Sequence, residues 1–171
     1  LLRQFGRIWA GNDDNKASFV EALTILPLGH RVGKWPILML ASEGHNLVGK
    51  VAALADTDRE DGEEFKAPKW HSELDSAVGK YFWSDPTLEP SVLEGNEDLV
   101  RQALISVGWQ EPLEGLTMAS LRQHFKAKSG TKGDFALELS ALLIENPERV
   151  VVPRHIAEMY DWLFLAEETL R

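Results

Sequence analysis

The stretch KVAALADTDREDG, residues 50–62, decides the fold. It begins with an apolar run without polar alternation, which is typical of a strand covered on both faces in a parallel sheet. The run ends on Asp56 and Asp58, two acidic residues separated by one residue. Side chains two apart in a strand point the same way, about 6.6 Å apart along the chain. We therefore expect both carboxylates on one face, at the carboxyl end of a parallel strand.

The segments around this strand predict an α/β arrangement. ALTILPLGH, residues 22–30, is apolar and partly β-branched, which predicts a strand. PILMLASEGH predicts a helix that starts at Pro36 and ends near Gly44. Together with the strand over 50–58, these segments would form a strand, helix, strand unit with a right-handed crossover.

The rest of the chain is mostly helical by its apolar periodicity. A short helix over 70–78 precedes KYFWS, residues 80–84, which predicts an aromatic strand. The remaining apolar stripes predict helices over 1–10, within 85–108, and over 117–127, 132–145 and 153–170, with GNDDNK, residues 11–16, as a loop. We expect an α/β core over 1–110 and a helical extension over 111–171 that packs on it.

Composition limits the class of protein. The chain has 171 residues, 44% of them hydrophobic, which suffices for one domain with a sizeable core. It contains no cysteine, so disulfides and thiolate metal sites are excluded. No segment approaches the roughly 18 uninterrupted apolar residues of a membrane span. The first residues, from Leu1 on, lack the regions of a signal peptide, so we expect a cytoplasmic protein and a piece of a longer chain.

The charge balance bears on possible partners. There are 18 basic and 27 acidic residues, for a net charge of −9. Such an excess argues against nonspecific attraction to nucleic acid unless metal ions intervene. The histidines show no close pairing of the H-x-x-x-H type, which argues against a histidine zinc site.

The Asp56/Asp58 pair has two interpretations. Two carboxylates held close together repel each other unless a cation lies between them, and oxygen ligands favour magnesium, manganese or calcium. Alternatively, the pair only begins a solvated charge run, DREDGEE, residues 58–64. Spacing alone favours this second interpretation.

Five stretches, in order, carry a family resemblance: ALTILPLGH, GKVAALADTDRED, YFWSDPTLE, KGDFALELSALL and VPRHIAEMYDWL. They resemble the Toprim domain of the OLD (overcoming lysogenization defect) family of ATP-dependent endonucleases, a family that includes the nuclease subunit of the Gabija phage-defence system. The resemblance covers roughly residues 22–165. It implies a Toprim-like parallel sheet flanked by helices, with a helical C-terminal extension.

The resemblance also implies a site and a function. Asp56 and Asp58 would bind divalent metal, Glu89 would help to bind a second ion, and Lys132 would be the active-site lysine. The implied activity is DNA cleavage by two Mg²⁺ or Mn²⁺ ions. DNA would be the substrate, ATP would act through an ATPase domain outside this chain, and the parent protein would be a homo-oligomer.

Chemistry gives Lys132 an independent rationale. A lysine at a helix start adds a full charge to the backbone donors there, which suits a phosphate group. The alternatives are that Glu89 is an ordinary first-turn helix acid and Lys132 an exposed loop lysine.

One family feature is unmatched. Toprim domains carry a metal-binding glutamate on an earlier strand, but no glutamate precedes Glu21. Asp13 and Asp14 lie in a predicted polar loop, and Glu43 lies at a predicted helix end. We therefore expect the first strand to lie upstream or to be lost, and residues 1–171 alone to cleave DNA little or not at all.

Other functions stay open. One is a noncatalytic Toprim-like interaction module, and another is a primase- or topoisomerase-type Toprim domain. The latter is disfavoured because only Tyr81 and Tyr160 could serve in strand transfer, and neither is evidently placed for it. GHRVGKW, residues 29–35, does not have phosphate-loop spacing. The six tryptophans are expected in the core or at an interface rather than as base-stacking platforms.

Overall fold

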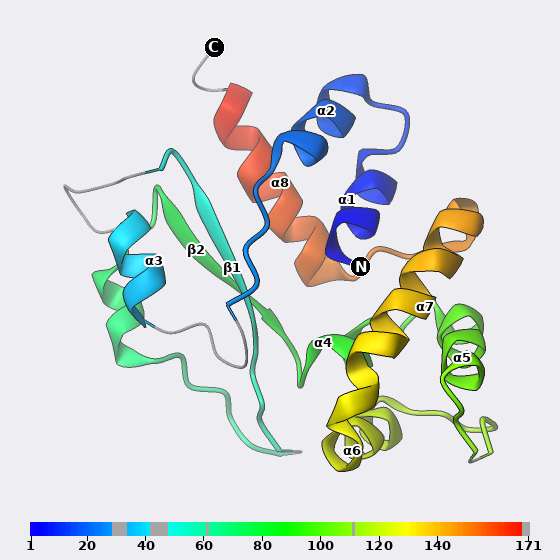
Figure 1. Ribbon diagram of the computed structural model, residues 1–171. Helices are drawn as coiled ribbons and strands as arrows, with labels where there is room; N and C mark the ends of the chain where they lie inside the picture. The colour runs from blue at the N-terminus through cyan, green and yellow to red at the C-terminus, as the bar shows by residue number, and fades with distance from the viewer. Residues whose placement is uncertain (29–33, 42–47, 61, 111, 169–171) are drawn as a thin grey trace.

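The computed structural model describes residues 1–28, 34–41, 48–60, 62–110 and 112–168 (Figure 1). Over these residues the protein is mixed α/β, with eight α-helices and a two-stranded sheet. The helices are α1 (Leu2–Ala10), α2 (Asp14–Ala22), α3 (Lys34–Ala41), α4 (Leu88–Ser91), α5 (Glu97–Ser106), α6 (Met118–Ala127), α7 (Lys132–Glu145) and α8 (Arg154–Glu168). The strands are β1 (Val51–Asp56) and β2 (Gly79–Ser84), and the 3₁₀ helices are η1 (Lys69–Glu73), η2 (Ser129–Thr131) and η3 (Pro147–Arg149).

The two strands pair in parallel, as predicted. Their register runs from Val51 opposite Gly79 to Asp56 opposite Ser84, so both carboxyl ends lie at the same edge. On one face, Phe82 of β2 packs against Trp162 of α8, with ring centroids 6.1 Å apart. Figure 1 shows α3 on the other side of the sheet from α8. Cover on both faces explains why β1 is apolar without alternation.

An aromatic cluster covers the second face of β2. Tyr81 and Trp83, two residues apart, point the same way, and their rings stack 5.2 Å apart. His71 of η1 stacks on Tyr81 at 4.2 Å. In place of the predicted helix over 70–78, the structure has the shorter 3₁₀ helix η1, which carries His71.

The predicted strand over 22–30 is wrong where the structure describes it. Residues 23–28 are irregular, and Ile25 and Leu26 are 40% and 65% exposed. Pro27 has no N–H to donate to a sheet, which disfavours a central strand. Within the described residues the predicted strand, helix, strand crossover is therefore not seen, and the parallel connection runs from β1 through η1 to β2. Residues 29 and 30, and the predicted helix end near Gly44, lie outside the described residues.

Helix α2 is a second difference from the sequence prediction, which placed a loop over 11–16. The side chain of Asp13 accepts hydrogen bonds from the N–H groups of Asn15 (2.9 Å) and Lys16 (3.1 Å). This N-cap satisfies two donors that a helix start otherwise leaves open, so α2 begins at Asp14.

The later helices agree with prediction. α6, α7 and α8 match the expected ranges, whereas the helical region within 85–108 is divided into α4 and α5. α4 ends at Ser91, and Gly95, with a left-handed φ of 78°, lies in the turn just before Asn96, the N-cap of α5.

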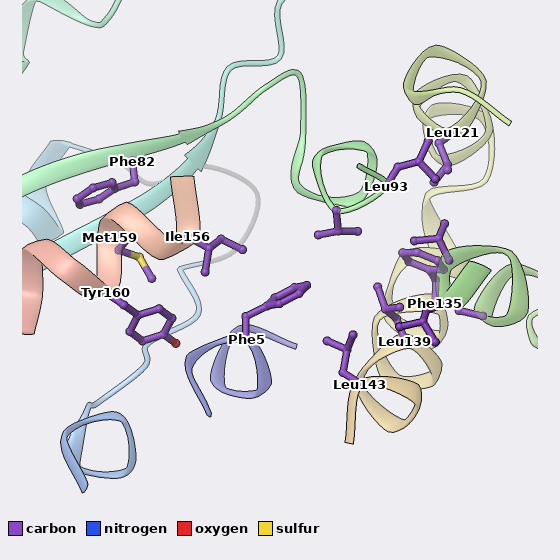
Figure 2. Close-up of a cluster of buried hydrophobic side chains, with 14 of the residues drawn as sticks. Phe5, Phe82, Leu93, Leu121, Phe135, Leu139, Leu143, Ile156, Met159 and Tyr160 are labelled. Atoms are coloured by element: carbon purple, nitrogen blue, oxygen red, sulfur yellow. The ribbon is translucent and has the colours of Figure 1, made fainter. Parts of the chain in front are cut away.

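One hydrophobic cluster connects helices from both ends of the chain. Phe5 of α1 is fully buried, and Figure 2 shows it between Ile156, Met159 and Tyr160 of α8 on one side and Leu139 and Leu143 of α7 on the other. Residues on both sides of position 110 thus share a core, and the division into 1–110 and 111–171 stays a prediction.

None of the helices in the described part of the chain is both long enough and apolar enough to span a membrane.

Candidate functional site

The candidate site lies where β1 and β2 end. Asp56 is the last residue of β1, and the chain that leaves β2 runs directly into α4, which carries Glu89 in its first turn. Figure 1 shows α4 beyond the end of β2, beside α7. Lys132 is the first residue of α7. Three elements far apart in sequence therefore meet at the carboxyl edge of the sheet.

Backbone contacts join the loops that follow the two strands. The N–H of Thr57 donates to the carbonyl of Ser84 at 2.9 Å, and the N–H of Asp58 donates to the carbonyl of Pro86 at 2.9 Å. The hydroxyl of Thr57 also donates to Oδ1 of Asp85 at 2.8 Å. These bonds hold the Asp56–Asp58 segment against the segment that leads to Glu89.

Glu89 and Lys132 form an ion pair. Nζ of Lys132 lies 3.2 Å from Oε2 of Glu89, and the hydroxyl of Thr87 donates to the same oxygen at 3.1 Å. The Glu89 side chain is only 14% exposed, whereas that of Lys132 is 36% exposed. Glu89 is thus a first-turn helix acid, as one alternative had it, but it is mostly buried and paired, and Lys132 lies at a helix start rather than in a loop.

Asp56 is half-buried and in an acidic environment. Its Oδ1 accepts a hydrogen bond from the N–H of Leu88 at 3.0 Å. Burial and the nearby carboxylate of Glu89 raise the pKa of Asp56 to about 6, with a smaller contribution from Asp58. The Leu88 N–H and the charge of Lys132 act in the opposite direction. Glu89, Asp58 and Lys132 therefore all lie close enough to Asp56 to affect its pKa.

Asp58 does not occupy the position that strand alternation predicts. β1 ends at Asp56, and Asp58 has a left-handed φ of 53°, a conformation that aspartate adopts more readily than most residues. The expectation that Asp56 and Asp58 point the same way along a strand is therefore wrong. Asp58 is exposed, and its carbonyl accepts a hydrogen bond from Nη2 of Arg122 on α6 at 3.0 Å.

The described residues contain no group of three or more histidine or acidic side chains arranged to hold a metal ion. Asp13 is the N-cap of α2 and Asp14 is the first residue of that helix, so neither lies on a strand. Glu43 and residues 29–33 of GHRVGKW lie outside the described residues.

Two residues at the site escaped the sequence prediction. Thr87, which supports Glu89, stands in the quoted YFWSDPTLE stretch, two residues before the glutamate, so that spacing could have marked it. Arg122 lies 64 residues from Asp58, and no local pattern connects the two.

The chain matches no protein-family model, and neither a curated protein nor a solved structure is significantly similar to it.

Proposed function

We propose that this chain is a divalent-metal-dependent DNA endonuclease domain, with a Toprim-like fold and a site formed by Asp56, Asp58, Glu89 and Lys132. The observation that carries the proposal is the Glu89–Lys132 pair beside Asp56 at the carboxyl edge of the parallel strands. Open α/β sheets bind ligands at that edge. The proposal thus has two independent supports: the family resemblance of short stretches that contain these residues, and the proximity of the residues in the structure.

The donor set fits the proposed metal in chemical type. Carboxylate oxygens are the ligands that Mg²⁺ and Mn²⁺ prefer, and Asp56, Asp58 and Glu89 would supply them. A bound divalent ion would supply Lewis-acid stabilisation of the phosphate oxygens and a more acidic water. In this proposal Lys132 contributes positive charge to the phosphate group, and its exposure on the solvent side of Glu89 suits that role.

Other parts of the proposal follow the resemblance. DNA is the substrate, the ATPase lies outside residues 1–171, and the parent protein is a homo-oligomer. Bound cations would also offset the net charge of −9, which otherwise repels DNA.

A noncatalytic interaction domain is the second candidate. It is favoured by the lack of an assembled three-ligand metal group among the described residues. In that case the Glu89–Lys132 pair would serve only to hold α4 against α7.

Manganese binding separates the two candidates. Calorimetric titration of residues 1–171 should show weak Mn²⁺ binding that Asp56→Ala and Asp58→Ala abolish. Glu94→Ala, which removes an exposed carboxylate next to α4, is the matched control and should bind like the wild type. Absence of binding by the wild type, or equal binding by all variants, contradicts the nuclease proposal.

Cleavage is the second measurement. The parent protein should nick plasmid DNA in Mn²⁺, and Asp56→Ala should remove that activity while its melting temperature shows that the fold remains. Undiminished nicking by a folded Asp56→Ala variant would place the active site elsewhere.

A further inference from the structure

A second polar feature adjoins the candidate site. A cleft of about 460 Å³ lies between the loop after β1 and helix α6. Its polar lining includes three cations, Arg59, Arg122 and Lys126, and two carboxylates, Glu60 and Asp85. In a chain with a net charge of −9, a cleft whose described lining has more positive than negative side chains is a local exception.

Glu60 is held by two cations from α6. Its Oε2 lies 3.2 Å from Nη1 of Arg122, and its Oε1 lies 3.1 Å from Nζ of Lys126. Each carboxylate oxygen thus has its own cation, an arrangement that two oxygens of a phosphodiester group could also adopt. The Glu60 and Lys126 side chains are 57% and 72% exposed, so an external anion can reach the pair without unfolding α6.

Arg122 connects the cleft with the acidic site. Its side chain is only 15% exposed, and its second nitrogen, Nη2, donates to the carbonyl of Asp58 at 3.0 Å. The guanidinium is therefore held at both ends, with one nitrogen on the Asp58 carbonyl and the other on the Glu60 carboxylate. A fixed guanidinium loses less freedom on binding phosphate than a mobile one.

We propose that Arg122 and Lys126 form a binding subsite for a backbone phosphate of nucleic acid, and that Glu60 occupies this subsite until a phosphate displaces it. The inference rests on the proposed function, because it assigns to this cleft a phosphate of the same strand that enters the acidic site. Arg59, held by Asp85 through its Nε at 2.7 Å, lines the same cleft and adds positive charge.

Binding of a short labelled DNA duplex to residues 1–171 tests the subsite, measured by fluorescence anisotropy in EDTA over a series of salt concentrations. Lys126→Ala should weaken binding and lower the slope of log K against log salt concentration by about one, the effect of losing one phosphate contact. Glu60→Gln should tighten binding several-fold, because it frees both cations.

Glu21→Gln is the matched control. Glu21 is also shared by two cations, Arg7 at 2.7 Å and Arg3 at 3.9 Å, but it lies on α2. Like Glu60→Gln, the Glu21→Gln variant removes one negative charge and breaks an exposed pair of a carboxylate with two cations. Tighter binding by Glu60→Gln than by Glu21→Gln supports the subsite, whereas equal effects mean that only total charge matters and overturn it.

Three further outcomes would overturn the proposed subsite. Wild-type binding and salt slope in Lys126→Ala overturn the phosphate contact, and so does a wild type that binds no duplex at the lowest salt concentration. If Lys126→Ala weakens calorimetric binding of inorganic phosphate but not of the duplex, the cleft takes free phosphate and the nucleic-acid inference is wrong. Because EDTA excludes metal binding and cleavage, these results stand apart from those of the manganese titration.

Discussion

Lys132 and Glu89, separated by 43 residues in sequence, are joined by an ion pair of 3.2 Å between Nζ and Oε2. The pair fixes the first residue of α7 against the first turn of α4, at the edge of the sheet where Asp56 ends β1. The ammonium neutralises part of an acidic cluster that burial makes unfavourable. Removing either partner should therefore change both the charge of the site and the chemistry proposed for it.

The first prediction concerns Lys132→Ala in the parent protein. If the ammonium stabilises charge on the phosphate, single-turnover cleavage should slow by roughly 100-fold or more, as for the loss of one preorganised electrostatic contact. Mn²⁺ affinity should not fall, because the ammonium is no metal ligand. Lys128→Ala, an exposed lysine before α7, is the control. Wild-type cleavage by Lys132→Ala would remove this residue from the active site.

The second prediction concerns the pH dependence of stability through Asp56. Its folded pKa of about 6 lies above the ordinary value of 3.8, so the folded state binds the proton more tightly. The resulting contribution to stability is fully present below about pH 4 and is lost as pH rises through 6. Asp56→Asn, which keeps an acceptor for the Leu88 N–H, should therefore melt a few degrees above the wild type at pH 8.

The same variant should melt near the wild-type temperature at pH 4, where Asp56 is protonated. Thermal melts at both pH values, with Glu94→Gln as the exposed control, measure the difference. An equal gain at both pH values would show that Asp56 is not the titrating group.

The third prediction isolates the effect of Glu89 on its neighbour. The Glu89 carboxylate raises the pKa of Asp56, second only to burial, so Glu89→Gln should lower that pKa from about 6 without restoring the ordinary value. Carboxyl NMR titration of Asp56 measures the shift. Glu97→Gln on α5 should leave it unchanged, and an unshifted Asp56 in Glu89→Gln would contradict the proximity of the two groups.

The fourth prediction tests the packing of α1 on α8. A Cβ added to Gly6 would lie 2.6 Å from Tyr160 and 2.9 Å from Val20, closer than side chains approach. Gly6→Ala should therefore lower the free energy of unfolding by about 1–3 kcal/mol, the usual effect of overpacking. Denaturant unfolding gives the value.

Gly133 of α7 provides the opposite control. A Cβ there would meet no atom within 4 Å, so Gly133→Ala should stabilise α7 by up to about 1 kcal/mol through helix propensity. A Gly6→Ala variant as stable as the wild type would mean that α1 packs elsewhere.

The sequence by itself determined those helices and strands whose buried side chains form a local pattern of apolar residues. The continuous apolar run of β1 predicts a covered parallel strand, and KYFWS predicts its partner. The apolar periodicity of α6, α7 and α8 predicts their ranges closely. The predicted strand over 50–58 contains β1 but runs two residues beyond its end at Asp56.

Local pattern failed where tertiary packing or side-chain capping decides. Residues 22–28 combine β-branched and apolar residues, yet 23–28 pair with no strand in the described part of the chain. Asp13 caps a helix, α2, over the preceding segment. β1 already ends at Asp56, and Asp58 has a left-handed φ of 53°, which side-chain spacing does not predict.

Only the tertiary structure decided which charges meet. Lys132 reaches Glu89 across 43 residues and Arg122 reaches Asp58 across 64, through the packing of α6 and α7 beside α4. The raised pKa of Asp56 likewise depends on burial by surrounding elements. Periodicity records which side of an element is buried, whereas the partner of a polar side chain depends on how separate elements pack, and spacing along the chain carries no information about that.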